Sequence, residues 1–112
     1  MVAKKVLFVC HHGVLSGTVA SEFREFVNNA APGSYHVDNM ALHLSSGPHF
    51  FDEQKLLNAD HIVAFYRTHL EEINKFVKQA GLPTKTHHTK SYMLNWEERL
   101  LEEIEQTSRK IL

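Results

Sequence analysis

The chain has 112 residues, 43% of them hydrophobic, which suits one compact domain over residues 1–112. Its 12 Lys+Arg and 13 Asp+Glu give a formal net charge of −1 without a block of either sign, which argues against a nucleic-acid partner. No stretch is apolar for long enough to span a bilayer, so we expect no direct membrane insertion. A single cysteine excludes an intramolecular disulfide framework, and the chain opens without an apolar signal segment; both favour the cytoplasm.

Apolar runs and helical repeats alternate along the chain. Continuous runs rich in β-branched and aromatic residues predict strands, and apolar residues at three- and four-residue steps predict helices. The expected strands are 4–9, 34–37, 61–66 and 84–89, and the expected helices are 17–30, 51–58, 70–80 and 94–112, with an irregular loop over 42–48. Pro32-Gly33 and Gly81 close the first and third of these helices.

This alternation predicts the fold class. Strands that alternate with helices favour an α/β three-layer sandwich with a four-stranded parallel sheet and right-handed crossovers. Ligands of such sheets bind at the carboxyl edge of the strands. The only cysteine, Cys10, follows the first expected strand and therefore falls on that edge.

The segment after Cys10 has the composition of a phosphate-binding loop. Gly13 and Gly17 free the loop amides, and Ser16 and Thr18 add hydroxyl donors. The start of the following helix favours the thiolate form of a nearby cysteine. Two other interpretations stay open: Cys10 is a buried, inert thiol, and the two hydroxyl residues are helix N-caps.

Cysteine at this position of this fold occurs in the low-molecular-weight protein tyrosine phosphatases, whose loop reads C-x5-R-[ST]. In those enzymes the arginine clamps the phosphate, and an aspartate beyond the fourth strand protonates the leaving group. Here the sixth residue after Cys10 is Ser16, and no aspartate follows Asp60. The loss of the clamp and of the acid argues against efficient phosphomonoester hydrolysis.

Residues 10–27 instead resemble the IIB components of the bacterial sugar phosphotransferase system, of the galactitol and lactose type. The shared features are the cysteine after the first strand, the Gly/Ser/Thr loop and a helix opening with Thr18-Val19-Ala20-Ser21-Glu22. The resemblance extends to 58–63 and 81–83. It departs from the usual pattern at His11-His12, at Gly17 and at 91–96, where a glycine-bearing segment is absent.

The resemblance implies a cytoplasmic phosphocarrier. Cys10 would accept a phosphoryl group from a histidine of a IIA protein and pass it to a sugar held by the IIC membrane protein, without a cofactor or metal. The residues implied to hold the phosphoryl oxygens are His11, His12, Gly13, Val14, Leu15, Ser16, Gly17 and Thr18. The alternatives are a degenerate phosphatase-like domain with weak or no hydrolase activity and a non-catalytic regulatory or metal-binding module.

Nine histidines are many for this length, and two pairs, His11-His12 and His87-His88, stand where the first and fourth strands should end. One histidine of each pair could join Cys10 in a metal site. Alternatively, a protonated His11 or His12 would stabilise the Cys10 thiolate, or these are surface residues. The acidic residues of the last helix, Glu103 among them, are interpreted as a solvated face.

Overall fold

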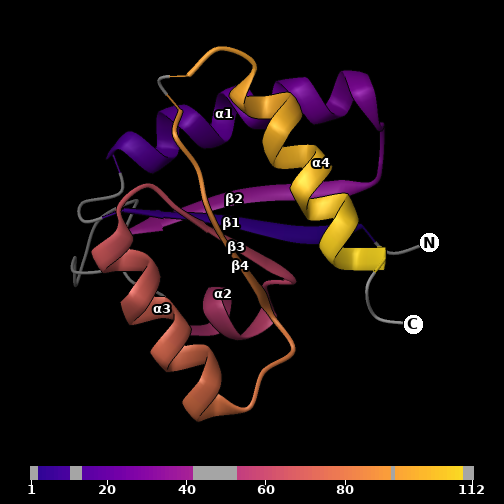
Figure 1. The fold of residues 1–112 in the computed structure, drawn as a ribbon. Coiled ribbons are helices and arrows are strands. Elements are labelled where there is room, and N and C mark those ends of the chain that lie inside the picture. Colours follow the sequence, from indigo (N-terminus) through magenta and orange to yellow (C-terminus); the bar gives the residue numbers. More distant parts are fainter. Residues whose placement is uncertain (1–2, 11–13, 42–52, 92, 110–112) are drawn as a thin grey trace.

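The computed structural model describes residues 3–10, 14–41, 53–91 and 93–109. Strands and helices alternate in it, as the sequence predicts (Figure 1). In chain order the elements are β1 (Lys4–Cys10), α1 (Val14–Ala30), β2 (Tyr35–Ala41), α2 (Glu53–Asn58), β3 (His61–Ala64), α3 (Arg67–Ala80), β4 (Lys85–His88) and α4 (Trp96–Arg109).

All strand pairs of the four-stranded sheet are parallel, in the order β2-β1-β3-β4. Strand β1 is central, and its last five residues are buried, which explains why the apolar run does not alternate with polar residues. The register aligns Cys10 with Ala41 of β2 and Val9 with Ala64 of β3. The predicted α/β class with a four-stranded parallel sheet is therefore confirmed.

Helices cover both faces of the sheet (Figure 1). Val6 and Phe8 of β1 pack with α1 and α4, and Leu7 and Val9 pack on the opposite face with α2 and α3. On the α1–α4 face the ring of Phe23 lies 5.5 Å from that of Phe8 and 6.0 Å from that of Trp96, between ring centroids. This arrangement gives the predicted three layers.

Two boundaries differ from the prediction for clear physical reasons. Helix α1 begins at Val14 instead of near Gly17, because the buried residues Val19 and Phe23 stabilise a helix that tolerates a glycine near its start at a cost of about 1 kcal/mol. Strand β2 continues to Ala41 through polar residues, since β1 offers a complete ladder of backbone partners beside it.

The remaining described boundaries lie within three residues of the expected ones, and the largest difference is the start of α3 at Arg67 instead of residue 70. Helix α3 ends at Gly81, whose φ of 65° lies in the left-handed region that glycine adopts without strain. The loop expected over 42–48 and the last residues expected in the final helix, 110–112, lie outside the described residues. In the part of the chain that is described, no helix combines the length and the apolar character needed to cross a membrane.

Candidate functional site

Cys10 is the last residue of the central strand β1 and is 4% exposed. Parallel pairing places the ends of β2 and β3, at Ala41 and Ala64, on either side of it. Burial is also typical of inert structural cysteines, so exposure does not separate the two interpretations of this thiol. What favours a functional thiol is its position in the topology.

That position is the topological switch point of the sheet. The connection through α1 leads from β1 to β2 on one side, and the connection through α2 leads back past β1 to β3 on the other side. These two connections leave the sheet in opposite directions at the carboxyl ends of β1 and β3, which is the place where α/β proteins commonly bind ligands. Cys10 ends one of these two strands.

Helix α1 begins four positions after Cys10, at Val14. The amide groups of the first helical turn, those of Val14, Leu15 and Ser16, have no acceptor within the helix and point toward its start. Together with the positive end of the helix dipole, they favour an anion at the end of β1. The predicted site residues His11, His12 and Gly13 lie outside the described residues.

The structure changes the setting of the two hydroxyl residues. Because α1 begins at Val14, Ser16 lies in the first helical turn and Thr18 in the second, so neither occupies the N-cap position. Thr18 is exposed, and Gly17 between them is half-buried. The N-cap alternative is therefore wrong, whereas their role in holding a phosphoryl group stays a prediction.

The second histidine pair does not face Cys10. Strand β3 lies between β1 and β4, which separates the ends of β1 and β4 by two strand spacings, roughly 10 Å. His88 bonds through Nε2 to the carbonyl oxygen of Phe65, at 3.0 Å. Across the described segments, no group of three His, Cys, Asp or Glu residues has a metal-binding arrangement.

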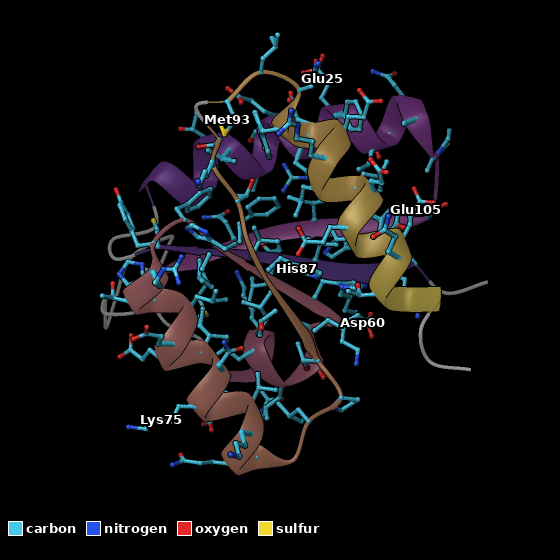
Figure 2. The ribbon with its side chains drawn as sticks, viewed as in Figure 1. Glu25, Asp60, Lys75, His87, Met93 and Glu105 are labelled. Atoms are coloured by element: carbon cyan, nitrogen blue, oxygen red, sulfur yellow. The ribbon has the colours of Figure 1, made fainter. Side chains whose placement is uncertain are left out.

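His87 instead belongs to a buried cluster that joins three elements. Its Nε2 lies 3.0 Å from Nδ1 of His61 in β3, and its Nδ1 lies 2.9 Å from the Glu103 carboxylate in α4. His61 and His87 are 2% and 1% exposed, and the Glu103 side chain is half-exposed. Figure 2 shows His87 on the side of the sheet that α4 covers. We call His61, His87 and Glu103 the histidine cluster.

The environment of His61 favours its neutral form. Burial lowers its pKa from 6.5 to about 4, and His87, Lys4 and Lys85 act in the same direction, whereas Asp60 opposes them. A charged His61 would be held against a second imidazole in a site closed to water. The imidazole of His61 is therefore uncharged at neutral pH and forms its contact to His87 as a hydrogen bond.

No family model matches the chain, and no curated protein matches it. Function is therefore inferred from the residues and their geometry.

The sequence does not indicate the histidine cluster. Its patterns place Glu103 in the solvated face of the last helix and His87 at the Cys10 edge. One signal is present: His61 opens an apolar strand run, and a histidine there must find a partner once the strand is buried. The identity of that partner depends on the register, which aligns Val63 with His87 and so places His87 diagonal to His61.

Proposed function

We propose that this chain is a cytoplasmic phosphocarrier of the IIB type in a sugar phosphotransferase system, with phosphocysteine formed on Cys10. The observation that carries the proposal is the location of Cys10 at the switch point of the sheet, four positions before the N-terminus of α1. A thiolate there can attack a phosphoryl group while the first amides of the helix hold its oxygens.

Two group transfers make up the proposed cycle. In the first, the Cys10 thiolate attacks the phosphorus of a phosphohistidine on a IIA protein; the S–P bond forms, the N–P bond breaks, and the histidine leaves neutral. In the second, a sugar hydroxyl held by a IIC protein gives its proton to a base of that protein and attacks the same phosphorus. The S–P bond then breaks and returns the thiolate.

The residues around Cys10 favour transfer over hydrolysis. Ser16 stands where a phosphatase of this fold carries its arginine, and Asp60 is the last aspartate of the chain, so the usual leaving-group acid is missing. Transfer to a positioned acceptor needs the nucleophile and the anion-binding amides only. The intermediate would thus persist long enough to meet the second partner.

An exposed aromatic side chain lies near the proposed site. Tyr66, 55% exposed, follows β3, the strand that pairs with β1. On the far side of β3, the connection before α4 exposes Met93 and Leu94, at 40% and 84% (Figure 2). Aromatic residues and methionine are enriched in protein interfaces. These side chains support a partner that approaches the carboxyl edge of the sheet.

The test is phosphorylation from phosphoenolpyruvate by the general phosphotransferase proteins and a IIA protein of the same organism. We expect a mass gain of one phosphoryl group that is absent in Cys10→Ser. The matched control is His36→Gln, a change of an exposed residue on β2, which should be phosphorylated normally. Steady turnover of para-nitrophenyl phosphate that disappears in Cys10→Ser would instead support the phosphatase-like alternative and contradict the carrier.

A further inference from the structure

The two edges of the sheet differ in the length of backbone that they present to a further strand. The strand order places β2 at one edge and β4 at the other (Figure 1). Strand β4 has four residues, whereas β2 has seven and is as long as the central strand β1. Short edge strands are poor templates for strand addition, and long ones are good templates. Strand β2 is therefore the edge at which another chain could pair.

Alternate residues of β2 direct their backbone groups away from β1. Lys4 of β1 is the register partner of Tyr35, and its amide donates to the carbonyl oxygen of Ser34 at 3.0 Å. In a parallel ladder the bonding residues follow at every second position, so the even-numbered residues of β2 face β1. The amide and carbonyl groups of Val37 and Asn39 consequently face outward from the sheet.

Side chains of this chain already bond to these outward groups. Arg24 of α1 donates to the carbonyl oxygen of Val37, from Nη2 at 2.7 Å and from Nε at 3.3 Å. Lys55 of α2 donates from Nζ to the carbonyl oxygen of Asn39 at 3.3 Å. The same ammonium group lies 3.3 Å from Oδ2 of Asp38, whose Oδ1 accepts from the Asn39 amide at 2.8 Å. A further strand would have to displace these contacts before it could bond to β2.

We propose that the β2 edge is a latent interface between two copies of this chain, which Arg24 and Lys55 keep closed. The two side chains reach the edge from helices on opposite faces of the sheet, α1 on one face and α2 on the other. Charged side chains at an edge strand oppose strand addition in this way.

The charges along β2 indicate a second copy of the same strand as the occupant. Two copies can pair antiparallel about a twofold axis, and an axis at Val37 lets this residue bond to its own counterpart. His36 of each copy then lies opposite Asp38 of the other, and both side chains line the pocket beside α2, so they share one face of the sheet. A histidine opposite a carboxylate is a favourable pair, whereas an axis at Asp38 would set two carboxylates against each other.

The symmetry of such a dimer doubles the effect of each blocking side chain. Arg24 and Lys55 would have to leave their carbonyl oxygens in both copies before the two strands could pair. One substitution therefore removes two obstacles, and each lost hydrogen bond is worth several-fold in the pairing equilibrium.

The experiment is sedimentation velocity of the full chain over a range of protein concentrations. The variant Arg24→Met/Lys55→Met keeps an unbranched apolar side chain at both positions and loses both donors. We expect its dimer dissociation constant to be at least about tenfold lower than that of the wild type. Arg67→Met/Lys75→Met, the same change at two exposed positions of α3, is the matched control and should sediment like the wild type.

A proline variant and hydrogen exchange locate the association on β2. Asn39→Pro, added to Arg24→Met/Lys55→Met, removes an outward amide and leaves the ladder to β1 intact, so it should restore the wild-type sedimentation. Without the proline, the Val37 amide of the double variant should exchange more slowly at high protein concentration than at low. Circular dichroism checks the fold of the proline variant, and if that variant does not fold, exchange at Val37 decides alone.

Four results would each overturn the proposal. The first is a double variant that sediments like the wild type, and the second is equal association of the α3 control. The third is association of the double variant that leaves exchange at Val37 unchanged or that a folded proline variant does not reverse. The fourth is a wild-type protein whose Val37 amide gains the same protection with concentration, because its edge would then not be closed.

Discussion

The Cys10 edge and the histidine cluster are built in opposite ways within one small sheet. The proposed Cys10 site depends on backbone that is close in sequence, because Cys10 ends β1 and α1 begins four positions later. In the histidine cluster the side chains form the site, since His61, His87 and Glu103 come from three separate elements. The first site depends on local chain geometry and the second on tertiary packing.

This difference predicts how the two sites respond to mutation. A change at the Cys10 edge should affect phosphoryl transfer and spare the fold. A change in the histidine cluster should alter stability and its pH dependence and spare phosphoryl transfer.

The largest effect is expected for Cys10→Ser. Without the sulfur nucleophile, phosphorylation should fall below detection, a loss of at least about 10³-fold, since a serine hydroxyl is a far weaker nucleophile than a thiolate at neutral pH. His87→Gln should retain phosphorylation within about twofold. Intact-mass spectrometry of both variants tests this, and a phosphorylated Cys10→Ser protein would place the acceptor elsewhere.

Stability should depend strongly on pH through His61. Its pKa is 6.5 when unfolded and about 4 when folded, so the unfolded chain binds more protons between these values. The stabilisation that depends on a neutral His61 is fully present above pH 6.5 and is lost as the pH falls through 4. This loss lowers the free energy of unfolding by about 3 kcal/mol. Urea denaturation at pH 7, 5.5 and 4 measures how steeply the free energy of unfolding changes with pH.

A matched pair of variants tests whether His61 causes this pH dependence of stability. His61→Gln should flatten it between pH 6.5 and 4, because the titrating ring is gone. His36→Gln, which removes an exposed histidine, should keep it. An unchanged slope in His61→Gln would show that other groups cause the pH dependence.

A smaller effect is expected for Ser16→Ala. If the hydroxyl in the first turn of α1 holds a phosphoryl oxygen, phosphorylation should slow by about tenfold, as for the loss of one such donor. Ser21→Ala, an exposed hydroxyl further along the same helix, is the control and should leave the rate unchanged. Equal rates for both variants would show that the Ser16 hydroxyl does not hold a phosphoryl oxygen.

The smallest effect concerns Lys85→Met. Lys85 disfavours a charge on His61, so its removal should raise the pKa of His61, by a few tenths of a unit because the pair is partly screened by solvent. Lys75→Met, on an exposed position of α3, should leave that pKa in place. NMR titration of the His61 ring compares the two, and a fall in the pKa would contradict the assignment.

Periodicity predicts this fold well because the driving patterns are local. The apolar run of β1 and the helical repeat of α3 identify their elements without knowledge of any partner. The predicted start of α1 is three positions late, since Gly17 looks like a boundary and only the packing of Val19 and Phe23 shows that it is not. The predicted end of β2 is too early because it, too, depends on a tertiary contact. The backbone hydrogen bonds to β1 outweigh the poor strand propensity of Asp38 and Asn39.

Sequence alone established the position of Cys10 after a buried strand, the alternation that makes the sheet parallel, and the absence of an arginine at Ser16. These are properties of neighbouring residues, and local sterics and hydrophobic burial translate them directly into structure. Only the tertiary structure brought His61, His87 and Glu103 together. Their contacts depend on strand order, register and the placement of α4, which arise when the whole core packs at once.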